Sequence, residues 1–324
     1  MIAAVLDGLD LPLELKEIPR PQPGPEEVSV QLKAAALNKR DWWIIKGRYP
    51  GIIFPLVLGS DGVGIVDGKE VIINPGIDWG DQADQFDPAF RVLGMPEQGT
   101  LAEWINVPKS NLYDKPSHLN WNEAAALPVC GTTAYRAMFT RGRAVKGENM
   151  IVTGIGGGVA TMALLFGVAI GMKVWVTSSS ESKIDLAIQH GAMGGVNYQR
   201  PGWEKELESK AGGRFDLVID GAGGDDFSNL VTIMKPAGRM VMYGGTRGTI
   251  NGLSPQRIFW KQLDILGSSM GSPTDFKAML DFVNGHQIKP VVSHVFPLAD
   301  INQAMDIIAK GEQFGKICIE IPGA

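Results

Sequence analysis

The chain has 324 residues, 44% of them hydrophobic and 20% charged, an ordinary globular composition that allows one large or two medium domains. Its formal net charge is −5 and it carries no basic block, which argues against nucleic acid or an anionic membrane as a partner. Two cysteines far apart in the sequence exclude a secreted disulfide framework and predict a reducing cytoplasm. The most apolar stretch, residues 159–170, is shorter than the roughly 20 residues that a bilayer span needs.

The first 120 residues are rich in proline, glycine and short strand-like runs. Residues 28–32 alternate apolar and polar side chains, as a half-buried strand does. Residues 56–66 mix strand formers with glycines, which suits the bends of a barrel-like sheet, and residues 71–73 predict another short strand. The polar, glycine-bearing residues 76–99 predict a loop.

The pattern changes near residue 120. Trp121 to Tyr135 is predicted to be helical, with breaks at Pro128 and Gly131. Beyond it, strands are predicted at residues 150–153, 173–177, 215–219 and 240–243, and helices at 159–171, 182–190 and 227–234. This alternation predicts βαβ units and a parallel sheet. The last 50 residues predict helices near 276–284 and 301–310 and a closing strand at 317–320.

The strongest functional signal is the segment VTGIGGGVA, which ends a predicted strand and opens a helix, the context of a dinucleotide-binding loop. Glycines let the backbone approach a pyrophosphate, and free N–H groups at the helix start hold its charge. Gly154 and Gly156 fit the usual spacing, but Val159 stands where a third glycine is usual. The alternative frame of Gly154, Gly157 and Ala160 keeps a small residue at each point of close contact. A plain glycine turn is the alternative interpretation. The residues expected at the pyrophosphate are Gly154, Gly156, Gly157, Gly158 and Val159.

The end of the second strand bears on the choice between NAD and NADP. An NAD site usually has an acidic residue there to bind the ribose hydroxyls. This chain instead has three serines from Ser178 onward, and its first acid is Glu181. Ser178 and Ser179 could donate hydrogen bonds to a 2′-phosphate and Lys183 could supply positive charge, so NADPH is the predicted cofactor. Ser178 with Glu181 also matches a helix capping box, a role compatible with phosphate binding.

Several short motifs, in order along nearly the whole chain, resemble those of the quinone oxidoreductases of the medium-chain dehydrogenase/reductase superfamily. They are AALNKRD from Ala35, GRYP from Gly47, GSDGVG from Gly59, AAALP from Ala124, GTTAY from Gly131, the glycine loop, Gly191-Ala192, Asn197-Tyr198, Pro297-Leu298 and Gly315-Lys316. The resemblance implies an α/β protein with a GroES-like β-barrel catalytic domain (residues 1–120 and 271–324) and a Rossmann domain with a doubly wound parallel sheet (residues 121–270). It also implies an active site in the cleft between the domains, and a homodimer, commonly formed through Rossmann edge strands.

The same resemblance assigns roles to individual residues. Asn38 would donate a hydrogen bond to a carbonyl oxygen of the electron acceptor, and Tyr49 would donate to it or stack on it. Further cofactor positions are Thr133 and Lys316 near the nicotinamide half, and Tyr198 near the 2′-phosphate. Gly244, which follows a predicted strand, would let the backbone approach the cofactor.

No metal is predicted. Zinc-dependent relatives carry a cysteine where this chain has Asn38, and a histidine followed by a glutamate where it has Ser60 and Asp61. Their third ligand maps to Val129 or Cys130. At most one usable ligand remains, whereas catalytic zinc needs three. Asp61 is then better explained by a salt bridge or a turn cap, and Cys130 by packing as a small buried residue.

The predicted activity is therefore zinc-independent hydride transfer from NADPH to a quinone or a similar electron-poor acceptor, which needs no strong Lewis acid. An enone, alkenal or enoyl-thioester reductase remains an alternative. Four basic residues, Lys39, Arg40, Lys46 and Arg48, could meet the phosphates of a coenzyme A thioester, or could simply be solvated. A non-enzymatic NADPH-binding protein is a second alternative. The proton donor is not identified from the sequence, and both water and Tyr49 remain candidates.

Overall fold

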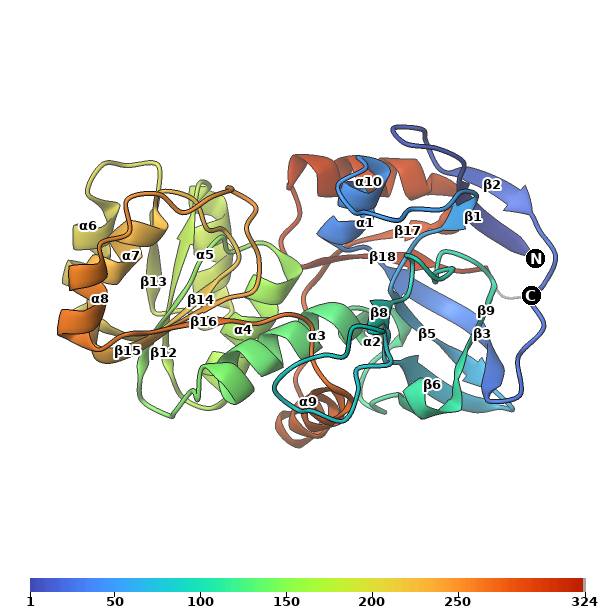
Figure 1. Cartoon of the computed structure of the whole chain (residues 1–324), viewed down its shortest axis with the longest axis horizontal. Coiled ribbons are helices and arrows are strands. Elements are labelled where there is room, and N and C mark those ends of the chain that lie inside the picture. The colour runs from blue at the N-terminus through green and yellow to red at the C-terminus, as the bar shows by residue number, and fades with distance from the viewer. Residues whose placement is uncertain (323–324) are drawn as a thin grey trace. The chain divides into compact units, whose positions relative to one another are not determined.

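The computed structural model describes residues 1–322, and the chain divides into two compact units (Figure 1). The first unit contains residues 1–132 and the residues from Gly271 onward; the second contains Thr133–Met270. The division falls after residue 132 rather than after residue 120 because helix α2 (Trp121–Ala125) packs on strands of the first unit. The predicted α/β fold class is confirmed. None of the helices within residues 1–322 has both the length and the apolar character that a bilayer crossing requires.

The main sheet of the first unit has the order β10-β6-β5-β3-β18-β17, with β9 also paired to β3. Its strands are β3 (Glu27–Ala36), β5 (Asp61–Val66), β6 (Lys69–Ile73), β9 (Trp104–Pro108), β10 (Leu112–Asp114), β17 (Val292–Pro297) and β18 (Lys316–Glu320). Smaller sheets contain β1 (Ile2–Leu6), β2 (Glu14–Glu17) and β4 (Leu56–Val57), and β7 (Gly76–Ile77) with β8 (Arg91–Val92). The further helices that lie wholly in this unit are α1 (Lys39–Ile45), α9 (Pro273–His286) and α10 (Ile301–Lys310). Residues 76–99 are mostly irregular, as predicted, apart from the short β7–β8 pair.

Three strands of this sheet bring distant segments together. Ala36 at the end of β3 pairs with Asp61 at the start of β5 on one side and with Cys318 of β18 on the other. The residues that flank these pairs, including Lys316 at the start of β18, are therefore forced into one small region although they lie far apart in the sequence. Close approach of β3 and β5 requires glycine, because a Cβ on Gly64 would lie 2.1 Å from the Gln31 carbonyl oxygen.

The second unit contains a six-stranded sheet, wholly parallel, of order β13-β12-β11-β14-β15-β16. Its strands are β11 (Asn149–Val152), β12 (Lys173–Ser178), β13 (Gly194–Asn197), β14 (Phe215–Asp220), β15 (Met234–Met242) and β16 (Asp264–Gly267). Its helices are α4 (Gly158–Ala169), α5 (Glu181–Gln189), α6 (Trp203–Ala211), α7 (Phe227–Thr232) and α8 (Pro255–Lys261). The chain winds from β11 to β13 in one direction and from β14 to β16 in the other, so the strand order reverses between β11 and β14.

Two predicted boundaries are wrong for identifiable reasons. The break predicted at Pro128 is confirmed, because α2 ends at Ala125 and Pro128 begins α3 (Pro128–Tyr135), a position where its missing N–H costs nothing. The break predicted at Gly131 is one of the two errors. Gly131 continues that helix, and a Cβ there would lie 3.1 Å from the Met279 sulfur, so the glycine serves packing. The helix predicted through residue 234 ends at Thr232, because Met234 already begins β15.

Candidate functional site

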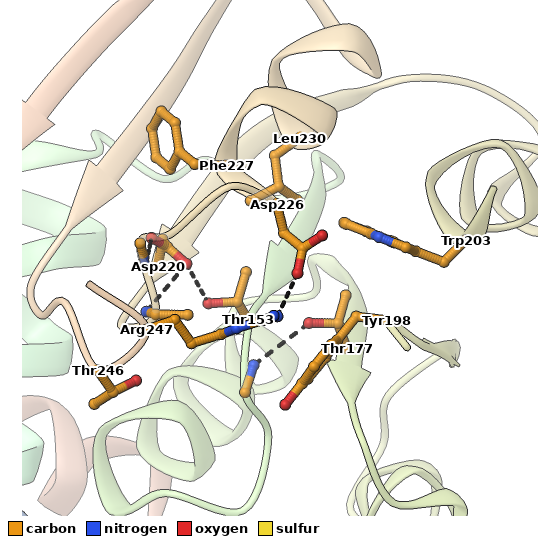
Figure 2. Close-up of a pocket in the computed structure, with 13 residues that line it drawn as sticks. Thr153, Thr177, Tyr198, Trp203, Asp220, Asp226, Phe227, Leu230, Thr246 and Arg247 are labelled. Atoms are coloured by element: carbon orange, nitrogen blue, oxygen red, sulfur yellow. Dashed lines mark hydrogen bonds and ion pairs between the residues drawn. The ribbon is translucent and has the colours of Figure 1, made fainter. Parts of the chain in front are cut away.

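A pocket lies at the carboxyl ends of the parallel strands in the second unit (Figure 2). Thr153 follows β11, Thr177 lies in β12, Tyr198 follows β13, Asp220 ends β14, and Arg247 lies in the loop after β15. These side chains surround the point where the strand order reverses. In open α/β sheets, ligands bind in the crevice at this point.

The predicted glycine loop connects β11 with helix α4 beside this pocket. Gly154 has φ +62° and Gly156 has φ +119°, conformations that side chains with a Cβ rarely adopt. Gly157 is the N-cap of α4, and the helix begins at Gly158 and Val159. The N–H groups of this first turn have no partner within the helix, so they and the helix dipole form a site suited to a pyrophosphate. Of these five residues, Gly154 lines the pocket directly.

The structure also explains the irregular glycine spacing. Ala160 is 1% exposed, whereas Val159 is half-buried, so Ala160 is the small residue that packs inward. Closer contact occurs two turns later, because a Cβ on Gly167 would lie 2.6 Å from Met150 Cε and 2.7 Å from Val174 Cγ2. The frame that ends at Ala160 therefore describes this helix better, and Gly167 completes the close packing of helix on sheet.

Thr153 and Asp220 form a buried pair at the reversal point that the sequence analysis missed. Thr153 Oγ1 donates to Asp220 Oδ1 at 2.6 Å, and the N–H groups of Ala222 and Gly223 donate to the same carboxylate at 3.3 and 2.9 Å. Burial raises the pKa of Asp220 above its ordinary value. The only signal in the sequence was an aspartate directly after an apolar strand. The pair fixes the loop that lines one wall of the pocket.

The serines after β12 are arranged differently from the prediction. Ser178 is 4% exposed, and its Oγ accepts a hydrogen bond from the Ser180 N–H at 3.1 Å. Ser180, and not Ser178, is the N-cap of α5, since its Oγ accepts from the Lys183 N–H at 3.4 Å. The predicted Ser178–Glu181 capping box is therefore wrong, because the helix begins at Glu181 and the N-cap is the residue before it.

Residues on β12 and β13 are nevertheless tied together at this edge. Tyr198 N–H donates to the Ser178 carbonyl at 3.1 Å, and Asn197 Nδ2 donates to the Ser179 carbonyl at 3.1 Å. Ser179 is exposed and Lys183 is half-buried. Of the predicted phosphate-binding residues, Tyr198 lines the pocket, while Ser178, Ser179 and Lys183 lie outside its lining.

Arg247 is a second residue that the sequence analysis missed. Its guanidinium carbon lies 4.8 Å from the centre of the Tyr198 ring, and its Nη1 forms an ion pair with Asp226 (Figure 2). No pattern in the surrounding loop marks this arginine, and its place beside Tyr198 depends on how two loops fold. It brings a cation to the part of the pocket where a phosphate was expected.

Two other predicted cofactor residues lie outside the pocket lining. The loop that carries Gly244 runs beside Gly221, and a Cβ on Gly244 would lie 3.0 Å from the Gly221 carbonyl oxygen. This close contact is enough to explain why residue 244 is a glycine, with no need for a bound cofactor. Thr133 is 6% exposed, and its Oγ1 lies 4.0 Å from the Met270 sulfur.

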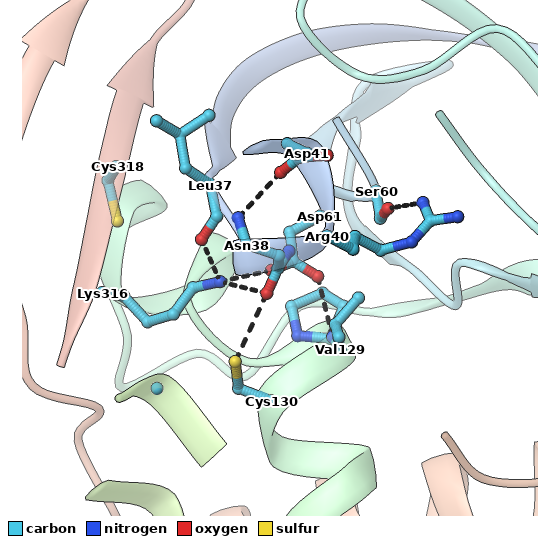
Figure 3. A network of polar contacts seen from close by, with 12 residues as sticks. Leu37, Asn38, Arg40, Asp41, Ser60, Asp61, Val129, Cys130, Lys316 and Cys318 are labelled. Carbon is cyan, nitrogen blue, oxygen red and sulfur yellow. Dashed lines mark hydrogen bonds and ion pairs between the residues drawn. The ribbon is translucent and has the colours of Figure 1, made fainter. Parts of the chain in front are cut away.

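A buried polar network lies in the first unit, where β3, β5 and β18 meet (Figure 3). Lys316 Nζ donates to the Leu37 carbonyl at 2.7 Å, to Asn38 Oδ1 at 2.7 Å and to Asp61 Oδ2 at 2.8 Å. Lys316 is 3% exposed and Asp61 is fully buried. All three protons of the ammonium are thus used within the first unit, which leaves Lys316 without a donor for the cofactor role that was predicted for it.

Asn38 is held from both ends of its amide. Its Nδ2 donates to Asp61 Oδ2 at 2.8 Å, and its Oδ1 accepts from Lys316 and also from the Cys130 thiol at 3.3 Å. Asp61 Oδ1 accepts from the Val129 N–H at 2.7 Å, so Asp61 forms both the salt bridge and the cap that were expected of it.

Three ionisable groups in and beside this network have shifted pKa values. Burial alone would lower the pKa of Lys316, but the Asp61 carboxylate reverses this effect and raises it above the ordinary value. Burial raises the pKa of Cys130 to about 11, so the thiol is protonated at neutral pH and can donate to Asn38. Burial also raises the pKa of Asp41, in the first turn of α1, to about 6.

Tyr49 lies near the opposite end of α1 from Asn38. Asn38 is the N-cap of the helix, and Tyr49 follows it in a loop, half-buried against the apolar core. The Arg40 guanidinium carbon lies 5.6 Å from the centre of the Tyr49 ring. Helix α1 thus links the two predicted catalytic residues, although only Asn38 takes part in the buried network.

The donor atoms at the zinc-ligand positions do not fit zinc. Asn38 and Asp61 surround the Lys316 ammonium, a cation that would repel a metal ion. Ser60 Oγ accepts from Arg40 Nη1 and donates to the Leu93 carbonyl, both at 2.7 Å. Within residues 1–322 there is no group of three or more histidine, cysteine, aspartate or glutamate residues placed to hold a metal.

Comparison with known proteins finds relatives of both units. Two family models match: the alcohol dehydrogenase GroES-like domain over residues 24–117 and the zinc-binding dehydrogenase domain over residues 158–285. Zinc-type alcohol dehydrogenase-like protein YogA of Leptosphaeria maculans is 40% identical, over 96% of this chain and 95% of its own. Acryloyl-coenzyme A reductase of Sulfurisphaera tokodaii is 28% identical, over 99% of this chain and 100% of its own.

Solved structures give the same result. An NAD-dependent alcohol dehydrogenase superposes with a TM-score of 0.93 at 35% identity, covering 99% of this chain and 100% of its own. The quinone oxidoreductase of Thermus thermophilus, solved also with NADPH, gives 0.82 at 29% identity, with coverage of 99% and 100%. The fold, the glycine loop at the strand-order reversal and these relatives together identify an NAD(P)-dependent oxidoreductase with a GroES-like and a Rossmann domain: the chain belongs to the medium-chain dehydrogenase/reductase family.

Proposed function

We propose that this protein is a zinc-independent reductase that uses NADPH to reduce a quinone or a similar electron-poor acceptor. The observation that carries the proposal is the buried Asn38–Asp61–Lys316 network, which holds an amide donor beside a fixed ammonium that would repel a metal ion. Such a site lacks a strong Lewis acid for alcohol oxidation. It suits an acceptor that already accepts hydride readily.

The residues of the second unit fit a nicotinamide dinucleotide. The N–H groups at the start of α4 would hold the pyrophosphate, with Gly154 and Gly157 allowing its close approach. When bound, the cofactor supplies the hydride, and the protein supplies orientation and hydrogen bonds.

The preference for NADPH rests on charge. No acid ends β12, where Ser178 stands, so the ribose 2′-phosphate would meet no carboxylate there. Tyr198 and Arg247 would face the adenosine half, and Arg247 neutralises the nearby Asp226. Lys183 and Ser179 are proposed as further phosphate contacts.

In the first unit, Asn38 would orient the acceptor. One N–H of its amide is bonded to Asp61, and the other has no partner among the described residues. That N–H could donate to a carbonyl oxygen of the acceptor as negative charge develops on it. Tyr49 is proposed as a second donor or as a stacking surface for a flat acceptor.

An enoyl-thioester reductase is the main alternative, and one relative is named as an acryloyl-coenzyme A reductase. The four basic residues that could meet its phosphates are mostly engaged elsewhere. Lys39 donates to the Ile308 and Ala309 carbonyls, and Arg40 donates to Ser60. Lys46 pairs with Asp10, and Arg48 stacks on Trp43 at 4.0 Å. These contacts favour a small, uncharged acceptor.

The test is cofactor oxidation at 340 nm with purified protein in EDTA, comparing NADPH with NADH against a quinone, an enone and crotonyl-coenzyme A. The expected result is NADPH-selective turnover of the quinone. Turnover of the enone or the thioester alone would move the assignment to that reductase class. NADPH binding without turnover of any acceptor would favour a non-enzymatic binding protein, and a preference for NADH would overturn the cofactor proposal.

We further propose that the protein forms a homodimer through the β16 edge of the parallel sheet. Strand β16 has a neighbour on one side only, and the adjacent helix α8 exposes Phe259 (59%) and Trp260 (79%). Large exposed apolar side chains beside an open strand edge are typical of an interface. Trp260→Glu should convert the dimer to a monomer in light scattering coupled to size exclusion. A wild-type protein that is already monomeric would contradict the proposal.

A cytoplasmic location is proposed from the state of the thiols. Cys130 and Cys318 are both free and buried, and neither is positioned as half of a disulfide. A reducing compartment suits such a chain. Fractionation of the source cells with an antibody would test it.

A further inference from the structure

We infer that Lys316 and Asp61 are positioning residues that lock the Asn38 amide in one orientation, and that Lys316 does not contact the cofactor. This inference rests on the proposed function, because the locked amide is the group that would meet the acceptor. It differs from the role first expected for Lys316, which was a contact with the nicotinamide half of the cofactor.

The electrostatics of the amide explain the lock. Asn38 Oδ1 faces the Lys316 ammonium at 2.7 Å, and Nδ2 faces the Asp61 carboxylate at 2.8 Å. A half-turn of the amide would set the oxygen against the carboxylate and the NH₂ group against the ammonium, replacing two charge-assisted hydrogen bonds by two repulsions. The network therefore permits one orientation only.

Complete use of the donors supports a positioning role. Lys316 donates all three protons, to Leu37, Asn38 and Asp61. Asp61 Oδ1 accepts from the Val129 N–H, so its second oxygen alone faces the amide and the ammonium. Both charged groups are almost wholly buried, and the ammonium has no proton left to donate to a phosphate or a ribose.

The lock also selects which proton of Asn38 is presented. One N–H is held by Asp61, so the other points in a fixed direction, and Asn38 keeps 6% of its surface exposed. The ammonium on Oδ1 polarises the amide and makes the remaining N–H a better donor. A preorganised donor of this kind stabilises charge on an acceptor oxygen without reorganisation during the reaction.

The experiment uses the full-length protein with Lys316→Met, Asp61→Asn and the double variant. Lys115→Met is the matched control, since the side chain of Lys115, another lysine of the first unit, is 5% exposed, donates to the Leu119 carbonyl and pairs with Glu70. For Lys316→Met we expect kcat to fall roughly 10- to 100-fold with the best acceptor, the size expected for a misplaced reacting group. The KM and Kd of NADPH should stay within about 2-fold, because the ammonium has no free donor.

The double variant separates positioning from folding. Removing Lys316 alone leaves the buried Asp61 carboxylate unpaired and should lower the melting temperature, whereas the double variant removes both charges and should recover most of that loss. Its kcat should stay low, because no pair of opposite charges then fixes the orientation of the Asn38 amide. Recovery of kcat together with stability would overturn the inference, as would a rise in the Kd of NADPH that matches the loss of kcat.

A second readout does not depend on activity. In protein labelled with ¹⁵N-asparagine, the side-chain NH₂ of Asn38, assigned from its absence in Asn38→Asp, should give two well-separated proton signals in the wild type. The two signals should shift and broaden in Lys316→Met and in the double variant, but not in Lys115→Met. Unchanged signals in both Lys316 variants would overturn the inference, whether or not the wild type reduces an acceptor. Failure of the wild type to reduce any acceptor would count separately, against the proposed function.

Discussion

Thr153 Oγ1 lies 2.6 Å from Asp220 Oδ1, and this bond joins the ends of β11 and β14 at the point where the strand order reverses. Thr153→Val should remove the strongest neutral donor to a buried carboxylate, costing about 1–3 kcal/mol of stability. It should also raise the KM of NADPH, because the loop after Asp220 lines the pocket. Thr232→Val is the control, since the Thr232 hydroxyl donates to the Asn229 carbonyl within its own helix and not to a buried carboxylate. Equal effects of the two changes, measured by thermal unfolding and initial rates, would count against this account.

Ser178→Asp tests the cofactor preference. An aspartate at the end of β12 would repel a ribose 2′-phosphate and could accept hydrogen bonds from the ribose hydroxyls of NADH. The ratio of kcat/KM for NADPH over NADH should fall by about 10-fold or more, which corresponds to at least ~1.4 kcal/mol. Initial rates with both cofactors measure this ratio. An unchanged ratio would show that the 2′-phosphate does not lie near Ser178.

Arg247→Gln probes the cation beside Tyr198. The change removes the positive charge and leaves the Asp226 carboxylate without its ion pair, so the KM of NADPH should rise more than that of NADH. Adding Asp226→Asn to Arg247→Gln should recover part of the lost affinity for NADPH, because it removes the unpaired carboxylate. Fluorescence titration of both cofactors gives the affinities. Equal weakening of NADPH and NADH would mean that Arg247 contacts the common part of the cofactor.

Gly167→Ala tests the close packing of α4. Its new methyl group would lie 2.6 Å from Met150 Cε and 2.7 Å from Val174 Cγ2, and overpacking of this kind costs about 1–3 kcal/mol. Gly285→Ala in α9 is the control, because a Cβ there has no atom within 4 Å and alanine favours a helix by about 1 kcal/mol. Chemical denaturation should show that the free energy of unfolding falls in Gly167→Ala and rises in Gly285→Ala.

Asp41 predicts a defined pH dependence of stability. Burial raises its folded pKa to about 6 from an ordinary value of 3.8, and one of its carboxylate oxygens has no hydrogen-bond partner. Because the folded pKa is raised, the stabilisation is complete below the unfolded pKa and is lost as the pH rises through about 6. The loss is on the order of 3 kcal/mol. The charges that act on it are Arg40 and Lys316, which lower the pKa, and Asp61, which raises it.

Asp41→Asn should abolish this pH dependence. Melting temperatures of the wild type should decrease relative to those of the variant between pH 4 and pH 6, since only the wild type must ionise a buried acid. A constant difference between the two proteins across that range would contradict the raised pKa.

Local patterns predicted the second unit well because each βαβ element is contiguous in the sequence. Helix α10 was predicted at its observed bounds, since its apolar residues keep a helical period. Strand β13 and helix α6 were missed because β13 is short with two glycines, and α6 buries only Trp203 and Leu207 among polar residues. The glycine loop could be predicted because its chemistry, like the βαβ pattern, depends on residues that are neighbours in the sequence.

Contacts between distant segments could not be predicted in this way. Arg247 and Tyr198 meet through two loops, and Lys316 reaches Asn38 only because β18 pairs with β3. The sequence analysis selected both Asn38 and Lys316 through family resemblance, but it separated them into an acceptor site and a cofactor site. The order of strands in the sheet, which no local pattern encodes, is what joins them.

The position of β18 between two other strands has a consequence for biosynthesis. This strand lies between β3 and β17 and carries Lys316, yet it is synthesised after every other described strand of the sheet. During translation the second unit, which is a continuous segment, can already fold, but the first unit still lacks the strand that joins β3 to β17. During that interval β3 presents an open edge, and Asp61 is a charge without its partner. The nascent chain is therefore most exposed to aggregation and to chaperones in the interval before β18 leaves the ribosome.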